Sequence, residues 1–222
     1  MDKGVITALE VQKRNKERVN VFIDGEYAFG LSLMEAARLK KGQVLSAGEI
    51  ARLKGEDAVV QAVESAAHFL SYRPRSLQEV RRNLKEKELP PEVTEAAVER
   101  LTALGYLDDE AFARYWVQNR AEFKPLSHRA LRQELRQKGI ADSIINEVLA
   151  GQDEQGLAYE AAQGQLRRLR QKTLREFKTK MSAFLQRRGF SYSTTQDVVV
   201  RIIEEMEAGD PDYFNRAIDN ED

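Results

Sequence analysis

The spacing of hydrophobic residues changes character near residue 32. Before it, apolar and polar side chains alternate in short β-rich segments, which predicts strands at Val5–Val11, Val19–Ile23 and Tyr27–Leu31. The dipeptide Asp24-Gly25 tolerates the positive φ of a tight hairpin, so the second and third strands should be joined directly. The polar, basic stretch 12–18 is predicted to be a loop. We therefore expect a small antiparallel sheet of three strands.

From residue 32 to residue 207 the apolar positions follow the period of amphipathic helices. Ser32 with Glu35, and Ser46 with Glu49, match the capping box, in which a hydroxyl and a carboxylate satisfy the free N–H groups at a helix start. The second box opens a predicted helix over 47–71. Helix-breaking residues interrupt the pattern further on, at Pro74, Pro90, Pro91, Gly105, Pro125, Gly139 and Gly189.

These breaks recur every fifty residues or so, and the sequence between them recurs as well. Residues 80–89 (VRRNLKEKEL) align with 131–140 (LRQELRQKGI) and with 181–190 (MSAFLQRRGF). Because residues i and i+4 share one face of a helix, each copy should point two apolar residues inward. These pairs are Val80 with Leu84, Leu131 with Leu135, and Met181 with Leu185. The match continues downstream, where Val93, Ala97 and Val98 correspond to Ile144, Val148 and Leu149, and to Thr194, Val198 and Val199.

The predicted fold class is mainly α: three tandem three-helix repeats in an elongated, curved array, preceded by a small N-terminal antiparallel β-sheet. The predicted division assigns 1–31 to the N-terminal strands, 32–57 to linking helices, 58–107, 108–157 and 158–207 to the three repeats, and 208–222 to an acidic C-terminal tail. An exposed concave side of such an array suits binding to a long polymer.

Charge is unevenly distributed along the chain, although its 222 residues carry a net charge of only −1. Between residues 167 and 188 nine cations accompany a single acid, Glu176. The cations are Arg167, Arg168, Arg170, Lys172, Arg175, Lys178, Lys180, Arg187 and Arg188. The C-terminal region reverses the sign with Glu204, Glu205, Glu207, Asp210, Asp212, Asp219, Glu221 and Asp222. A basic surplus of this size repels itself unless a partner or the acidic tail neutralises it, so we expect it to bind a partner.

The residue types that enzymes and metal sites require are scarce. The chain has no cysteine, no Gly-rich phosphate loop and no apolar run near the ~20 residues of a membrane span. His68 lies in an apolar context and His128 near a helix start, so the two cannot form the ligand cluster of a zinc site. Asp108-Asp109 fits a helix N-terminus better than acid–base chemistry. We expect a soluble, cytoplasmic, non-enzymatic protein with no signal peptide, metal site or cofactor.

Several aromatic residues have two interpretations. Tyr106, Phe112, Tyr115 and Trp116 could stack on nucleic-acid bases. Phe112 and Trp116 are four positions apart on one helix face, however, which favours packing in the core. Tyr72 and Phe123 occupy the same position of the repeat, which also indicates packing.

Three motifs resemble the RecX family. They are Tyr72-Arg73-Pro74-Arg75-Ser76, residues 104–113 (LGYLDDEAFA) and residues 129–140 (RALRQELRQKGI). The similarity spans 58–205, and the strands before it resemble the N-terminal extension that many members carry. The third repeat departs most from the pattern, because Arg175 stands where the other two repeats have Pro74 and Pro125.

The resemblance implies a regulator that binds RecA and its filament on single-stranded DNA, and that inhibits RecA ATPase and strand exchange in recombination and DNA repair. It carries over no catalytic residue; we expect a monomer with at most weak direct DNA contact and no membrane partner. The partner-binding surface is expected among the cations of the repeats, namely Arg73, Arg75, Arg81, Arg82, Lys85, Lys124, Arg129, Arg132, Arg136, Lys138, Arg167, Arg168, Arg170, Arg187 and Arg188. The alternative is a general DNA- or RNA-binding helical module that acts without RecA, although such modules are usually basic overall.

Overall fold

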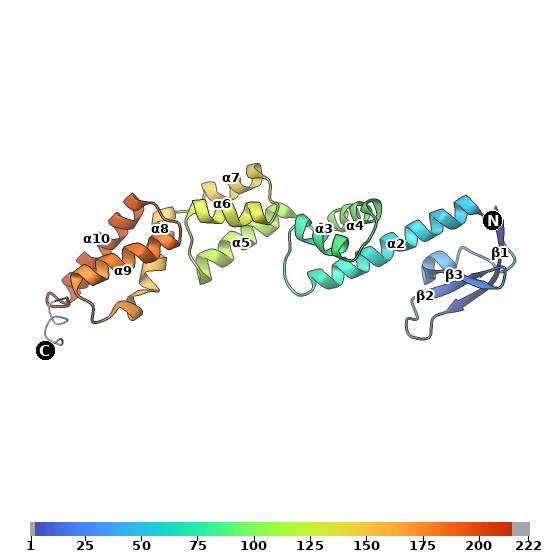
Figure 1. Cartoon of the computed structure of the whole chain (residues 1–222), viewed down its shortest axis with the longest axis horizontal. Coiled ribbons are helices and arrows are strands. Elements are labelled where there is room, and N and C mark those ends of the chain that lie inside the picture. Colours follow the sequence, from blue (N-terminus) through green and yellow to red (C-terminus); the bar gives the residue numbers. More distant parts are fainter. Residues whose placement is uncertain (1–2, 215–222) are drawn as a thin grey trace. The chain divides into compact units, whose positions relative to one another are not determined.

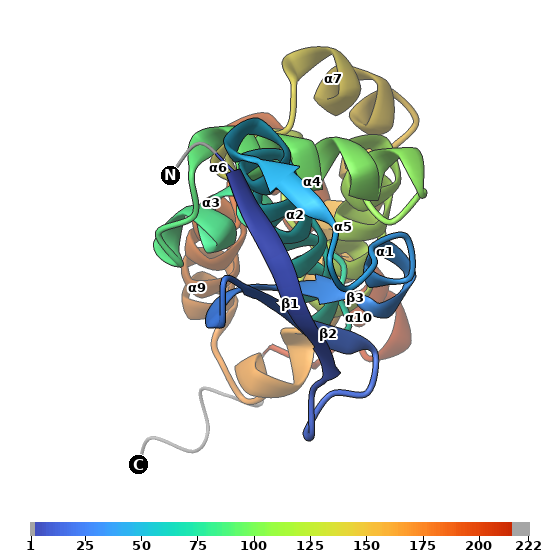
Figure 2. The same ribbon diagram turned by 90° about the vertical axis from the view of Figure 1, so that its right-hand side faces the viewer.

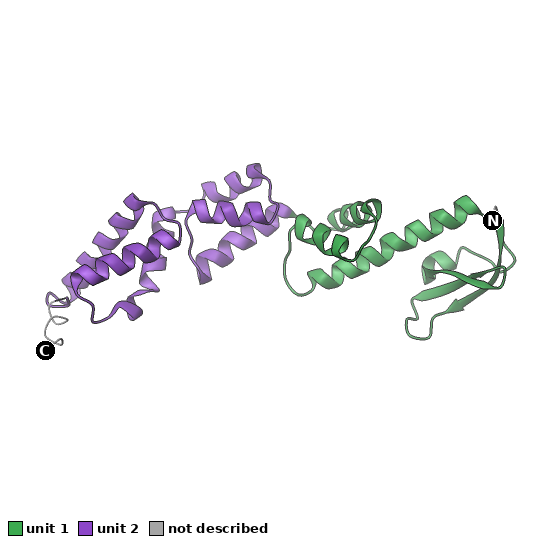
Figure 3. Ribbon diagram, viewed as in Figure 1, with its two compact units in different colours: residues 1–108 green, residues 109–222 purple. Residues whose placement is uncertain are grey.

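The computed structural model describes residues 3–214 and is mainly helical, as predicted. Within that range it contains one four-stranded sheet, ten α-helices and one 3-10 helix. The chain divides into two compact units, residues 1–108 and 109–222 (Figure 3). Of the predicted acidic tail, residues 215–222 lie outside the described residues. No helix in the described part is both long and apolar enough to cross a membrane.

The N-terminal sheet is antiparallel throughout, in the order β3-β2-β1-β4 (Figure 2). The three predicted strands are confirmed as β1 (Lys3–Val11), β2 (Arg18–Ile23) and β3 (Glu26–Ser32). The prediction of three strands followed directly by helices is wrong, because after the single helical turn α1 (Leu33–Ala36) the chain returns to the sheet as β4 (Val44–Ser46). Three residues are too few to show an alternating pattern, so only the pairing with β1 identifies this strand.

One long helix, α2 (Ala47–Leu70), packs against both the sheet and the first repeat (Figure 1). Its first half places Leu53 in the core of the sheet, and its second half places Ala62 and Ala66 against α3 (Leu77–Glu86) and α4 (Pro91–Ala103). The predicted boundary between residues 57 and 58 therefore falls inside a continuous helix. Its start is the predicted capping box, in which the Ser46 and Glu49 side chains each bond the other's backbone N–H.

A buried ion pair holds the sheet to the middle of α2. Arg18 Nη2 on β2 lies 2.8 Å from Asp57 Oδ2, and the two side chains are 11% and 6% exposed. Gln61, one turn further along α2, also donates to this carboxylate. Removing one partner of such a pair leaves a buried charge without compensation, so the pair fixes where the sheet sits on the helix.

The second unit contains the other two repeats in one continuous hydrophobic core. The middle repeat is α5 (Asp109–Phe123), α6 (His128–Gln137) and α7 (Asp142–Ala150). The last repeat is α8 (Glu154–Gln163), the 3-10 helix η1 (Leu166–Leu169), α9 (Leu174–Arg187) and α10 (Tyr192–Gly209). The predicted inward positions are confirmed, since Val80, Leu84, Leu131, Leu135, Met181 and Leu185 are all at most 1% exposed.

The middle helices of the repeats end alike but begin differently. Each is followed by a residue with positive φ, which is Glu88 (60°), Gly139 (80°) or Gly189 (93°). Ser76 and Ser127 cap α3 and α6 four positions before the first inward residue, whereas Thr173 caps α9 eight positions before Met181. Helix α9 is thus one turn longer. The alignment of Arg175 with the two prolines is wrong, because Arg175 lies inside this extra turn.

Candidate partner-binding surface

The outward face of each repeat's middle helix was expected to carry free cations. Three of these arginines instead reach across to the third helix of their own repeat. Arg81 of α3 binds Glu95 of α4 through two nitrogens, at 3.0 and 2.9 Å. Arg132, at the equivalent position of α6, donates to Asn146 of α7 at 2.6 Å, and Asn146 is in turn equivalent to Glu95. These contacts tie the second and third helices of the repeat together.

Arg136 is occupied in a similar way. Its guanidinium holds both carboxylate oxygens of Asp142, the first residue of α7, at 2.7 and 3.1 Å. This hydrogen bonding raises the pKa of Arg136 and lowers the pKa of Asp142. The carboxylate also stands at the N-terminus of α7, where the helix dipole favours a negative charge.

The two arginines of the Arg73-Pro74-Arg75 motif also have internal roles. Arg73 lies 2.8 Å from the carboxylate of Glu79, whose side chain is 6% exposed. The guanidinium of Arg75 stacks 3.6 Å from the centre of the Phe69 ring and donates to the Phe69 carbonyl oxygen. Burial lowers the pKa of Arg75. These contacts stabilise the first repeat and already engage both guanidinium groups, and partner binding by Arg73 and Arg75 stays a prediction.

Trp116 organises a further cluster on the middle repeat. Its ring stacks on Phe112 and has Arg120 and Lys138 over its faces, at 4.3 and 4.8 Å from the ring centre. The indole N–H and Arg120 Nε both donate to Glu134 Oε2, at 2.8 and 2.7 Å. Packing of Phe112 and Trp116 against the core is therefore confirmed.

Four other aromatic residues are exposed. Tyr72 and Phe123, at the same position of the repeat, are 70% and 71% exposed. Tyr106 and Tyr115 are 64% and 43% exposed. The prediction that Tyr72 and Phe123 pack is therefore wrong.

Arg188 lies at the junction of the last two repeats. It donates to the carbonyl oxygen of Pro125 at 3.3 Å and lies over the Phe184 ring at 5.0 Å. Burial lowers its pKa. Its own backbone carbonyl accepts a hydrogen bond from the N–H of Ser127 at 3.1 Å, so Arg188 joins α9 to the start of α6.

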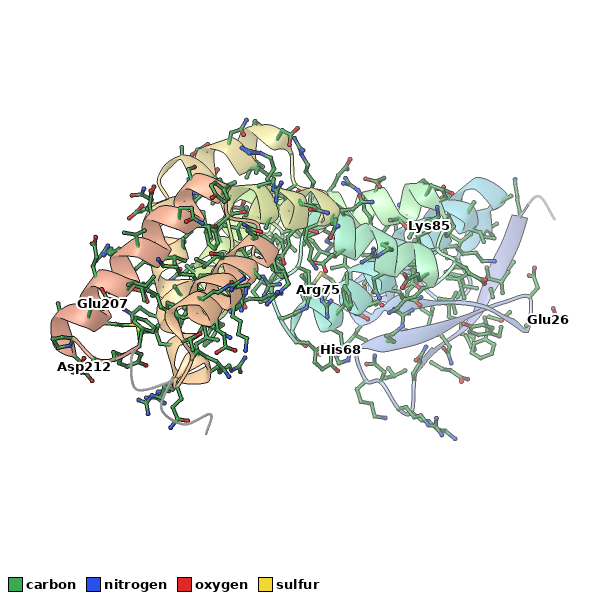
Figure 4. The ribbon with its side chains drawn as sticks, turned by 60° about the vertical axis from the view of Figure 1, so that its left-hand side comes forward. Glu26, His68, Arg75, Lys85, Glu207 and Asp212 are labelled. Carbon is green, nitrogen blue, oxygen red and sulfur yellow. The ribbon has the colours of Figure 1, made fainter. Side chains whose placement is uncertain are left out.

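Eight of the predicted cations remain exposed, with no hydrogen bond or ion pair from their side chains to any described residue. Arg82 and Lys85 lie on α3 of the first repeat, where Figure 4 labels Lys85. Lys124 and Arg129 flank the start of α6, and Arg129 shares a surface hollow with Arg132 and Arg136. The last repeat supplies Arg167, Arg168, Arg170 and Arg187. We call these eight residues the unpaired cations.

The paired arginines could have been found from a spacing in the sequence. Arg81 with Glu95, Arg132 with Asn146 and Arg120 with Glu134 are each fourteen residues apart. The first two pairs recur at the same repeat positions, so their polar partners were detectable from the repeat.

In residues 3–214 no group of three or more His, Asp or Glu side chains is placed to hold a metal ion.

Family models cover most of the chain. The N-terminal domain of regulatory protein RecX matches residues 4–46, and the first, second and third three-helix domains of RecX match residues 62–101, 108–149 and 152–199. A regulatory protein RecX of Lactobacillus delbrueckii subsp. bulgaricus is 36% identical over 209 residues, which cover 92% of this chain and 77% of the relative. The chain belongs to the RecX family. The Bacillus subtilis RecX is 34% identical over 91% of this chain and 77% of its own length.

Solved structures agree with this membership. A crystal structure of regulatory protein RecX superposes with a TM-score of 0.70 at 30% identity, covering 88% of this chain and 98% of that one. RecX from Lactobacillus salivarius, at 20% identity and a TM-score of 0.57, shares the fold over 67% of this chain.

A third relative by sequence is the RecX of Lactobacillus johnsonii, which is 40% identical. This match spans 68% of this chain but 56% of that relative's length.

Proposed function

We propose that this RecX-family chain binds RecA assembled on single-stranded DNA, and that it lowers the filament's ATP hydrolysis and strand exchange in recombination and DNA repair. The observation that carries the proposal is the distribution of the unpaired cations, which occur on all three repeats of a chain whose net charge is −1. Each group by itself makes a weak contact. Contacts linked along one chain raise the overall affinity well above that of any single one.

A protein filament suits these cations better than bare DNA does. Carboxylates accompany the basic residues of the first two repeats, as with Glu88 and Glu95 beside Lys85, and Asp142 beside Arg136. They repel a uniform row of phosphates but complement a protein surface of mixed charge. We propose that the chain acts in the cytoplasm as a monomer, without a cofactor.

The test is the rate of ATP hydrolysis by RecA on single-stranded DNA with increasing amounts of the full chain. The unpaired cations are reversed to Glu in three separate groups. Each group variant should inhibit ATP hydrolysis by RecA less than the wild-type chain does. The groups are Arg82 with Lys85, Lys124 with Arg129, and Arg167 with Arg168, Arg170 and Arg187. The matched control is Arg52→Glu with Arg201→Glu, because both arginines are 60% exposed but already paired with Glu56 and Glu205. Full inhibition by all three group variants would contradict the proposal.

The basic segment of the last repeat favours direct nucleic-acid binding as a second candidate. Its acid Glu176 lies within 4.0 Å of Lys172 and Lys180, and the other seven cations of this segment form no ion pair with any residue between 3 and 214. Excess single-stranded DNA separates the two functions. If it abolishes inhibition, the chain competes with RecA for the strand; if inhibition persists, the chain acts on RecA itself.

A further inference from the structure

A groove on the first repeat runs between α3 and the start of α4. One wall is the outward face of α3, with Arg82 and Lys85, and the other is the turn and first helical residues of α4, with Leu89 and Pro91. Arg81 and Glu95, which pair with each other, close its side. The groove therefore combines an apolar wall with two exposed cations that have no partner among the described residues.

Three features favour a bound negative group at the start of α4, although Glu88 and Glu95 line the rest of the groove. The N-terminus of α4 has no capping side chain, because its N-cap is Pro90. Thr94 lines the groove and is 6% exposed, yet its buried Oγ1 has no hydrogen-bond partner among residues 3–214. Buried hydroxyls are normally bonded, so an unsatisfied one beside two free cations indicates a missing acceptor. A helix N-terminus with free N–H groups adds attraction for an anion.

The middle repeat shows which group fits this place. Lys85 and Pro91 of the first repeat are equivalent to Arg136 and Asp142 of the middle repeat, in the register that aligns Leu84 with Leu135. In the middle repeat the Asp142 carboxylate lies across the helix start and binds Arg136 at 2.7 Å. The first repeat keeps the cation but has proline where the carboxylate would be.

We propose that this groove binds an acidic peptide segment of a partner protein. A carboxylate of the peptide takes the place that Asp142 fills in the middle repeat, between Lys85, Arg82 and the start of α4. The buried Thr94 hydroxyl donates to it after rotating toward the groove. An adjacent apolar side chain of the peptide packs on Leu89 and Pro91. The inference does not depend on RecA being that partner.

A peptide fits the groove better than a nucleic acid does. Glu88 and Glu95 lie along the groove and disfavour a continuous row of phosphates. A peptide presents single carboxylates spaced by apolar side chains, which matches the alternation of cations and apolar wall. Direct competition between the two kinds of ligand is therefore part of the test.

The experiment measures fluorescence anisotropy of a fluorescein-labelled peptide with a single aspartate between leucines and otherwise neutral residues, titrated with the full chain. We expect saturable binding, and little binding of the matched peptide with asparagine for aspartate. Pro91→Asp supplies the internal carboxylate of the middle repeat and should weaken binding about tenfold or more, equivalent to one charge-assisted contact. Pro91→Ser, which adds no charge, should bind within about twofold of wild type.

Further variants test whether the peptide binds in the groove and not elsewhere on the chain. Lys85→Gln and Thr94→Val should each weaken peptide binding, while Arg52→Gln, on a paired cation outside the groove, should not. Far-UV circular dichroism establishes that each variant is folded. Equal peptide affinity for wild type and Pro91→Asp overturns the proposal, as does absence of binding to wild type. Displacement of the peptide by a short oligothymidylate that binds more tightly also overturns it and assigns the groove to nucleic acid.

Discussion

Ser127 occupies the space that any side chain on Gly189 would need. A Cβ placed on Gly189 would lie 2.5 Å from Ser127 Oγ and 3.0 Å from Ala130 Cβ. Gly189 also has a φ of 93°, which L side chains rarely adopt. The start of α6 can therefore approach the end of α9 closely, and the backbone N–H of Ser127 donates to the carbonyl oxygen of Arg188 there.

Gly189→Ala should destabilise the second unit by about 2–4 kcal/mol, because backbone strain and a steric clash add together. The measurement is the free energy of unfolding from denaturant titration. Gly151→Ala is the matched control, since Gly151 ends α7 with a φ of −91° and open space around it. That control should change stability by less than about 0.5 kcal/mol. Similar values for the two variants would mean that the close approach is not needed.

The inward leucines of the three repeats should each contribute strongly to stability. Leu84, Leu135 and Leu185 are fully buried, so truncation to Ala should cost about 2–5 kcal/mol at each position. Denaturant unfolding of the three variants measures this cost. Leu104→Ala, at a position that is 59% exposed, serves as the control and should be nearly neutral. Losses below about 0.5 kcal/mol in all three would disprove the assignment of the inward face.

Glu88→Gly should stabilise the first unit by roughly 1 kcal/mol. Glu88 has a φ of 60° at the end of α3, where the other two repeats use glycine. A residue with a side chain in the left-handed region lowers the stability of the folded chain by about 1–2 kcal/mol compared with glycine. The greater freedom of glycine in the unfolded chain offsets part of the gain from the substitution. The midpoint of thermal unfolding should rise accordingly. Gly139→Ala, the reverse change at the equivalent position, should lower it; an unchanged midpoint in both variants would show that the turn is unstrained.

Thr195→Val should raise stability by about 1 kcal/mol, because it removes a buried hydroxyl without a partner and keeps the shape of the side chain. Thr195 is fully buried on α10, and its Oγ1 makes no hydrogen bond to any residue that the structure describes. The equivalent position of the middle repeat is the buried Ile145, which has no hydroxyl to satisfy. Chemical denaturation compares the variant with Thr194→Val, whose hydroxyl does bond to Ser191 and whose loss should not stabilise. A destabilised Thr195→Val would indicate an unseen partner for that hydroxyl.

The sequence by itself determined the repeats, the inward positions and most helix ends. A fifty-residue period aligned Leu84, Leu135 and Leu185, and the i, i+4 spacing placed each of them in a core. The capping box at Ser46 and Glu49 was readable for the same reason. The inward positions and the cap depend on residues within one or two helical turns of each other, and the period is found by comparing segments of the sequence directly, so no tertiary contact is needed to predict them.

Only the tertiary structure decided which cations are available to a partner. Arg81 is paired because α4 brings Glu95 beside it, and Arg136 because the next helix begins with Asp142. Exposure of Tyr72 and Phe123, and the pairing of Val44–Ser46 with β1, likewise depend on how distant segments pack. The outward positions of a helix look alike in the sequence whether their charges are solvated or paired. The difference arises only when another element supplies the partner. Arg82 and Lys85 of the first repeat have no such partner among the described residues, because Pro91 stands where the middle repeat has Asp142.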